Sequence, residues 1–293
     1  MSSYRFCRTD DIGLLVDALN HCWSPYFPDD PPMTAASFKR SIRDLQIWCS
    51  SCMVAFSGPE PIGVLIGAKR PYATLIHKIA VHPGHVRQGH GRHLLTSLGS
   101  KLAILGPPRM VAEIPETLAP AIGLFESCGY VRETHLADCV SQSEDLTRSD
   151  DPRSATASEH DGPLFIPITV DDLAANGLLG ADQRQHCWER SVETLTARKD
   201  DIEGIALASD ERIEAYLLYI KREDEAQIVA LHSTIADTGT RVRQLLFRLR
   251  SLGYTTFRFP KVEPTEISSL ALETSGFGQS GRYLRYAGTA RSE

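Results

Sequence analysis

Residues 73–105 read ATLIHKIAVHPGHVRQGHGRHLLTSLGSKLAIL, and this stretch decides the fold of the first half of the chain. Its first part, 75–81, is a short run rich in Leu, Ile and Val, which predicts a buried strand. The triplet at 82–84, His-Pro-Gly, marks a turn. The leucines within 94–102 recur with helical spacing and predict one apolar helix face. The stretch therefore predicts a strand, a glycine-containing loop and a helix.

The glycines of this loop, Gly89 and Gly91, stand where the predicted helix begins. The first backbone N–H groups of a helix have no intrahelical acceptor, and the helix dipole makes that end positive. Glycine lets an anion approach such amides closely. Arg87, Arg92 and His93 add positive charge nearby. The junction is suited to binding a pyrophosphate.

Other phosphate-binding loops have patterns that this stretch lacks. A P-loop needs GxxxxGK[ST], and a dinucleotide fingerprint needs a third glycine where Leu94 stands here. An ordinary strand-to-helix turn also accommodates two glycines. Gly-x-Gly alone leaves that alternative open.

The sequence of residues 79–95, around this loop, resembles the acetyl-CoA-binding segment of the GNAT-type N-acetyltransferases. The resemblance implies that the backbone of Ile79, Ala80 and Val81 binds the pantetheine arm of acetyl-CoA. It further implies that the loop binds the CoA pyrophosphate through a set of consecutive residues: Arg87, Gln88, Gly89, His90, Gly91 and Arg92. The first Arg or Gln of the family pattern [RQ]-x-x-G-x-[GA] is Val86 here, and we expect this departure to weaken donor binding.

The remaining periodicity of residues 4–140 predicts the order β-α-α-β-β-β-α-β-α-β, which resembles the GNAT fold. The segment Leu124–Tyr130, LFESCGY, resembles the family's L-Y-E-x-x-G-F ending. Asn20–Pro32 contains four prolines and predicts a loop. We expect an α/β (α+β) fold class, with a mixed, mostly antiparallel sheet flanked by helices.

The pattern then repeats at a constant offset of 150 residues. His77–His82 is matched by Gln227–His232, and Gly89 is matched by Gly239. Such self-similarity indicates an internal duplication. Between the copies, residues 141–162 are polar and lack periodicity, which predicts a linker. The expected domains are 1–140 and 163–293, as in tandem GNAT proteins.

The second copy differs at the loop itself. At the same offset, Gly91 becomes Arg241 and Arg87 becomes Asp237. A long side chain then stands at the phosphate approach, and a carboxylate repels phosphate. We therefore expect the second domain to be degenerate and to have lost CoA binding.

Composition limits the classes of function. A net charge of -6 argues against nucleic acid as a partner. No leader-like segment follows Met1 and no run of about 18 apolar residues occurs, so the expected location is cytoplasmic, without membrane binding. The 7 cysteines are expected to be reduced thiols. Cys49 and Cys52 form a lone CxxC, which lacks the second pair of a zinc site. No metal is expected.

Transfer of an acetyl group to an amine needs a base, because only the neutral amine attacks. His77 lies on the predicted central strand, where family members often carry a carboxylate base, and imidazole titrates near neutrality. Glu113, on the strand after the helix, is the second candidate. A structural histidine and a substrate-binding or solvated carboxylate are the corresponding alternatives. The family's tyrosine acid is replaced by Phe125.

Two functions of different class follow. The first is an acetyl-CoA-dependent N-acetyltransferase acting by direct attack on a primary amine of a small molecule, peptide or protein N-terminus. The second is a non-catalytic acyl-CoA-binding or scaffold protein, which Val86 and Phe125 favour. A phosphosugar- or nucleotide-binding protein is a distant third. The acceptor is expected over the central strand, under the 20–32 loop. Neither its identity nor the oligomeric state follows from the sequence.

Overall fold

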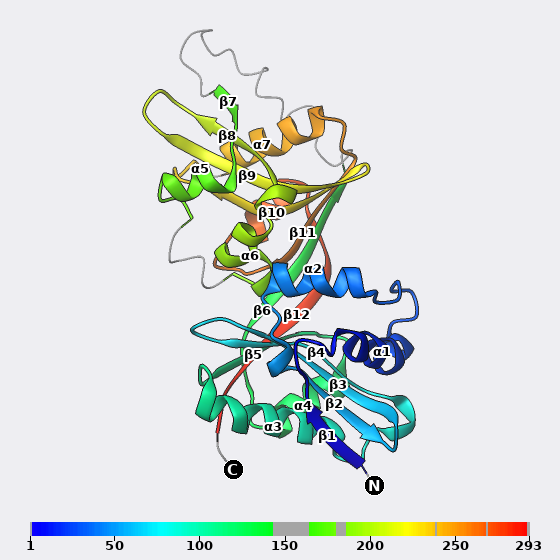
Figure 1. Cartoon of the computed structure of the whole chain (residues 1–293). Helices are drawn as coiled ribbons and strands as arrows, with labels where there is room; N and C mark the ends of the chain where they lie inside the picture. Colours follow the sequence, from blue (N-terminus) through cyan, green and yellow to red (C-terminus); the bar gives the residue numbers. More distant parts are fainter. Residues whose placement is uncertain (1, 143–163, 180–185, 238, 268, 292–293) are drawn as a thin grey trace. The chain divides into compact units, whose positions relative to one another are not determined.

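The computed structural model describes residues 2–142, 164–179, 186–237, 239–267 and 269–291 (Figure 1). The chain forms two compact units. The first unit contains Met1–Thr134 together with Leu284–Glu293, and the second contains His135–Tyr283. The predicted linker begins at residue 141, but β6 continues to Gln142. The rest of the linker, 143–162, lies outside the described residues. The functional domain limits at 140 and 163 stay a prediction.

The first unit contains mixed strands with helices on both faces. Its strands and helices are β1 (Ser2–Phe6), α1 (Ile12–Cys22), α2 (Ala35–Leu45), β2 (Met53–Ser57), β3 (Glu60–Lys69), β4 (Thr74–Val81), α3 (His90–Leu105), β5 (Arg109–Pro115), α4 (Ala119–Ser127) and the start of β6 (Val131–Gln142). The strand order is β1-β2-β3-β4-β5, followed by the end of β12 (Gly278–Thr289). Strands β1 to β4 pair antiparallel, and β4 pairs parallel with β5.

Helices α3 and α4 cover one face of these strands, and α1 packs against β3 and β4 on the other (Figure 1). The buried leucines of α3, from Leu94 to Leu102, are those that the periodicity predicted. Phe125 of α4 joins the same core. Helix α1 continues to Cys22, so the predicted loop begins three residues later than expected. Leu19 and Cys22 are buried and extend the apolar face of the helix by one more turn.

The second unit repeats this arrangement. Its elements are β7 (Leu164–Pro167), α5 (Val170–Ala175), α6 (Val192–Ala197), β8 (Glu203–Ala208), β9 (Ile213–Arg222), β10 (Glu225–Ser233), α7 (Thr240–Ser251), β11 (Thr256–Val262), α8 (Ser269–Thr274) and the start of β12. Strand β10 pairs antiparallel with β9 and parallel with β11. A 3-10 turn at Trp188–Arg190 precedes α6.

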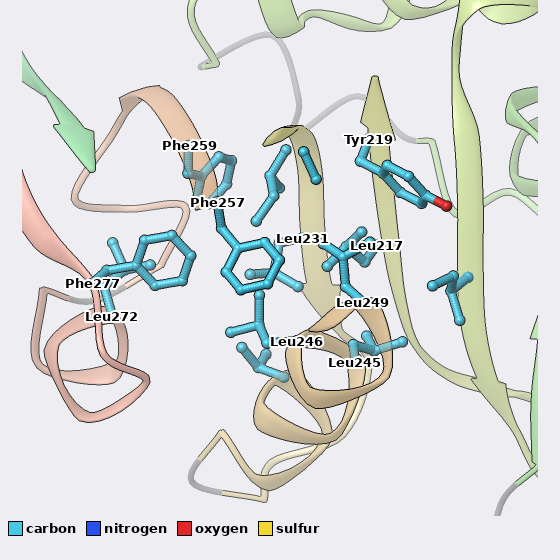
Figure 2. Close-up of a cluster of buried hydrophobic side chains, with 14 of the residues drawn as sticks. Leu217, Tyr219, Leu231, Leu245, Leu246, Leu249, Phe257, Phe259, Leu272 and Phe277 are labelled. Carbon is cyan, nitrogen blue, oxygen red and sulfur yellow. The ribbon is translucent and has the colours of Figure 1, made fainter. Parts of the chain in front are cut away.

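Alternation along β9 separates two cores in this unit, as expected for a strand buried on both faces. Leu217 and Tyr219 face the cluster of α7 and α8, which Figure 2 shows with Phe257 and Phe259 of β11. Tyr216 and Leu218 face the cluster under α5 and α6. Among the described residues, no helix is long and apolar enough to cross a membrane.

The end of β12 contributes core residues to the first unit. Leu284 is 6% exposed and Tyr286 is 2% exposed, and both join the cluster of α3 and α4. The Tyr286 hydroxyl donates to Glu126 Oε1 at 2.8 Å. The backbone N–H of Ala290 donates to the Pro108 carbonyl at 2.6 Å. The first unit therefore depends on residues from the far end of the chain.

We predict that Leu284→Ala lowers the free energy of unfolding by about 2–4 kcal/mol, because it leaves a cavity in the core of the first unit. Urea unfolding followed by circular dichroism measures the change. Leu270→Ala is the matched control: Leu270 is 69% exposed, and its truncation should stay within about 0.5 kcal/mol. Equal effects of the two substitutions would contradict this role of β12.

Candidate active site

Strand β4 separates from its parallel neighbour after a short contact. Among the described residues, the pairing of β4 with β5 is limited to Thr74 with Met110 and Leu75 with Val111. On its other edge, β4 stays paired with β3 as far as Val81. The backbone groups that β4 directs toward β5 beyond Leu75 lie outside this ladder and need other partners. We call this edge of β4 beyond Leu75, with its backbone donors and acceptors, the slot.

A β-bulge interrupts β4 at the start of this slot. Ile66 pairs with Lys78, but Gly67 pairs with Ile76, so His77 is the extra residue. Bulges bend a strand and redirect side chains, and they are frequent beside active sites. His77 is half-buried at this bend. Ile79, Ala80 and Val81 form the segment that follows it.

The chain turns from β4 into α3 through two residues with left-handed backbone. Arg87 has a φ of 64° and Gly89 a φ of 86°. Gly89 is the N-cap of α3, and no side chain caps the helix there. The first intrahelical bond joins His93 N–H to the Gly89 carbonyl at 3.0 Å. The preceding amides lack intrahelical acceptors, so this end of the helix favours an anion.

The glycines of this turn have different surroundings. Nothing lies within 4 Å of where a Gly89 Cβ would stand, so its exposed side is open. A Cβ on Gly91 would lie 3.0 Å from Leu124 Cδ2, so Gly91 also permits close packing of α3 on α4. Gln88 is exposed, and Arg92 Nη1 donates to the Ser127 carbonyl at 3.1 Å. His90 is buried.

Glu113 of β5 lies beside a residue that sequence reasoning missed. Arg285 Nη2 of β12 is 3.8 Å from Glu113 Oε1, and the two side chains are 11% and 5% exposed. The contact places a guanidinium beside a carboxyl group in a largely buried position. No local motif marks Arg285, and its partner is distant in sequence, so only the fold identifies the pair.

Phe125 and Tyr130 belong to the core. Both are buried, and their rings meet edge to face with centroids 5.0 Å apart. Tyr130 is therefore a packing residue. Because Phe125 is 1% exposed, the position that the family pattern gives to tyrosine packs against α3 and β5 here.

The segment after α1 crosses the end of β4. The Tyr26 hydroxyl donates to the Val81 carbonyl at 2.7 Å. The Asn20 side chain bonds the backbone N–H and carbonyl of Met33 at 2.7 and 2.9 Å, which fixes both ends of the segment. Trp23 stacks on Phe27 with ring centroids 4.5 Å apart, and Lys78 Nζ lies 3.9 Å from the centre of the Trp23 ring. A pocket here is lined by Leu19, Asn20, Trp23, Ser24, Asp30, Pro31, Met33 and Lys78.

Comparison with known proteins identifies this arrangement. Residues 15–130 match the model of the acetyltransferase (GNAT) family. This part of the chain is a GNAT acetyltransferase domain. The predicted enzyme class, an acyltransferase of the N-acetyltransferase type, is confirmed at this level. The GNAT family uses acetyl-CoA as donor and amines as acceptors. No curated protein matches the chain.

Solved structures show that the fold of the whole chain is similar to tandem GNAT proteins. A tandem GNAT protein from the clavulanic acid biosynthesis pathway is 14% identical with a TM-score of 0.64, covering 100% of both chains. A GCN5-related N-acetyltransferase from Sphaerobacter thermophilus is 13% identical with a TM-score of 0.65, covering 99% of this chain and 96% of that one. A putative acetyltransferase from Pyrococcus horikoshii is 14% identical with a TM-score of 0.61, covering 100% and 90%.

The described residues contain no group of three or more His, Cys, Asp or Glu side chains that could hold a metal ion. Cys49 and Cys52 of the CxxC are buried free thiols. Burial raises the pKa of both thiols, and it raises the pKa of neighbouring Cys7 to about 12. These cysteines therefore remain protonated at neutral pH, which disfavours thiolate chemistry.

In the second GNAT-like unit the corresponding helix, α7, begins in the same way, but a side chain of the protein bonds its first amides. Gly239, the N-cap of α7, has a φ of 86°, the same value as Gly89. The Asp237 carboxylate accepts from the backbone N–H of Gly239 at 3.1 Å and of Arg241 at 2.7 Å. Arg241 Nε bonds Glu214 Oε2 at 2.7 Å. A carboxylate of the chain itself thus binds the amides that an anionic ligand would need.

We predict that Asp237→Ala lowers the free energy of unfolding by about 1–2 kcal/mol, because the first amides of α7 lose their acceptor. Urea unfolding measures this loss. Calorimetric titration of the variant with acetyl-CoA should still give a single site per chain. Appearance of a second site would mean that Asp237 alone closes the second unit to the donor.

Proposed function

We propose that the chain is an acetyl-CoA-dependent N-acetyltransferase that moves the acetyl group to a primary amine of a small molecule or of a protein N-terminus. The observation that carries this proposal is the separation of β4 from β5 directly before a glycine-capped helix. The slot offers backbone groups to an extended ligand arm, and the helix start offers amides to its phosphates. The family match of residues 15–130 supports the same reaction class.

The donor fits this unit by its chemistry. The pyrophosphate of acetyl-CoA suits the open side of Gly89 and the first amides of α3, with Arg87 adjacent. The pantetheine amides suit the backbone of Ile79, Ala80 and Val81 along the slot. The Tyr26 hydroxyl already bonds the Val81 carbonyl, so this side chain would lie against the bound arm.

The transfer needs few groups. The neutral amine nitrogen attacks the thioester carbonyl carbon and forms the C–N bond. The negative charge on the carbonyl oxygen then needs a donor, and a backbone N–H of β4 near the bulge is suited to that role. The C–S bond breaks and the CoA thiolate leaves. The nitrogen, now bonded to the acetyl carbon, gives one proton to the base and becomes an amide nitrogen.

His77 is the proposed base, because it occupies the bulge at the start of the slot. An imidazole takes protons near neutral pH. Glu113 is the second candidate, directly or through water. Its side chain lies 3.8 Å from Arg285, so the guanidinium would hold it in place beside the slot. Because Phe125 is buried, the thiolate is proposed to take its proton from water.

The pocket beside Trp23 is the proposed acceptor site. Lys78, one residue after His77, lines this pocket, which connects it to the bulge of β4. Leu19, Trp23 and Met33 provide apolar surface for the body of an amine. Asp30 is suited to attract its ammonium group.

The second candidate function is a non-catalytic acyl-CoA-binding scaffold. Two observations favour it: Phe125 is in the core, and Val86 is 45% exposed where the family pattern has a polar residue. Such a protein would bind acetyl-CoA but release no CoA in the presence of any amine. Turnover separates the two functions directly.

The donor site is tested with a matched pair of N-cap substitutions. Gly89→Asp should abolish the rise in melting temperature that acetyl-CoA causes, because a carboxylate would repel the phosphates and compete for the amides. Both glycines have a φ of 86°, so Asp introduces similar backbone strain in the two variants, and the comparison separates this strain from repulsion of the phosphates. Gly239→Asp alters the equivalent position of α7, which has the same φ, and should leave the rise unchanged.

If acetyl-CoA still raises the melting temperature of Gly89→Asp, the donor binds elsewhere. A rise that is lost in both variants would point to a general effect on folding. No rise for the native chain at millimolar acetyl-CoA would remove the donor from the proposal.

Catalysis is tested at the bulge. His77→Ala should lower kcat by about 100- to 10,000-fold, the usual contribution of a general base, while acetyl-CoA binding persists. Release of the CoA thiol with a panel of primary amines measures turnover, and calorimetry measures binding. Gln227→Ala, the matching position of β10, is the control. An unchanged kcat in His77→Ala would mean that His77 is not the base. Glu113 would then be the candidate, and Glu113→Gln is its test.

A further inference from the structure

Histidines gather around the proposed donor site. The chain has 10 histidines, and those of one group come from the end of α1, from the loop after β4 and from the first turn of α3. We call them the histidine rim: His21, His82, His85, His90 and His93. Three of them, His85, His90 and His93, lie within four residues of Gly89, whose turn is suited to phosphate.

The rings of the rim form a chain of close neighbours. His21 and His82 stack with centroids 4.5 Å apart and an interplanar angle of 7°. The ring centroid of His85 lies 6.1 Å from that of His82 and 6.4 Å from that of His90. At this spacing, charges on adjacent rings would repel one another.

Tyr4 of β1 holds the other end of the rim. Its hydroxyl is 2.6 Å from His90 Nδ1, and its ring centroid is 3.8 Å from that of His93. His90 is 6% exposed, and within the described ranges its Nε2 has no hydrogen-bond partner. Burial, followed by the nearby His85 and His93, lowers the pKa of His90. The ligand-free protein thus disfavours a charge on this ring.

The other ionisable groups that lie near the rim include a carboxylate, a thiol and two arginines. Glu60 Oε1 of β3 lies 3.1 Å from His21 Nε2. The Cys22 thiol of α1 is protonated, because burial raises its pKa to about 12. Arg87 stands in the loop, and Arg92 on α3 bonds the Ser127 carbonyl. Glu60 apart, these neighbours provide no fixed negative charge to stabilise imidazolium.

We infer that binding of the CoA phosphates is coupled to proton uptake by the histidine rim. The inference rests on the proposed function, because it requires that the phosphates bind at Gly89. Phosphate oxygens bring negative charge and hydrogen-bond acceptors to the rings, which favours the imidazolium form. The charge that burial disfavours on His90 becomes favourable beside a phosphate.

The sign of the pH dependence follows from linkage. If the complex binds more protons than the free protein, the affinity rises as the pH falls through the titration range of imidazole. One coupled proton changes the affinity by up to about tenfold per pH unit. Donor affinity should therefore be greater at pH 6 than at pH 8.

Calorimetric titration of the full chain with CoA tests this coupling. Titrations at pH 7 in two buffers with different ionisation enthalpies give the number of protons taken up per CoA. The native chain should take up protons, and the double variant His82→Gln/His85→Gln should take up fewer and bind CoA more weakly at pH 6. Glutamine keeps hydrogen-bonding capacity without titrating. His135→Gln, an exposed site outside the rim, is the matched control and should keep the native uptake.

The outcomes separate the two proposals. CoA binding without net proton uptake would overturn the coupling and leave the proposed function intact. Uptake that is unchanged in the double variant would also overturn it, because the protons would then belong to other groups or to CoA itself. Absence of CoA binding at both pH values would overturn the proposed function and the coupling together.

Discussion

The early end of the β4–β5 ladder is the constraint on which the active unit depends. In the described part of the chain, two residue pairs join the strands, and beyond them β4 continues beside β3. Backbone groups that leave a sheet ladder need other partners, so this edge of β4 is suited to an extended ligand that bonds the backbone. The bulge at His77 and the turn at Gly89 stand at the two ends of this segment.

The two halves show two ways to satisfy the same helix start. Gly89 and Gly239 place the chain in the same left-handed conformation, which only glycine adopts without strain. In the second half the Asp237 carboxylate bonds the released amides, whereas no side chain caps α3. An internal anion stabilises the protein permanently, and an external anion makes the same amides a binding site. The same helix start is thus closed by the chain's own carboxylate in one half and left without a side-chain cap in the other.

The sequence predicted what depends on local pattern. Periodicity predicted the strand and helix of 73–105 and the repeat at an offset of 150. The same offset matched Gly89 with Gly239, and the backbone freedom of glycine explains why both helices begin with this residue. The sequence could not predict what depends on distant segments. The Arg285–Glu113 pair, the contact of Tyr26 with β4 and the clustering of the histidines join residues that no short motif connects. The bulge at His77 depends on register with β3, which alternation alone leaves undefined.

The last residues of β12 give the molecule a defined order of assembly during its synthesis. A ribosome makes the N-terminal part of a protein first, and domains commonly fold as they emerge. Here Leu284 and Tyr286 belong to the core of the first unit, so that unit stays incomplete until the second has been translated. A nascent chain that stops before β12 would therefore lack part of the core of the first unit.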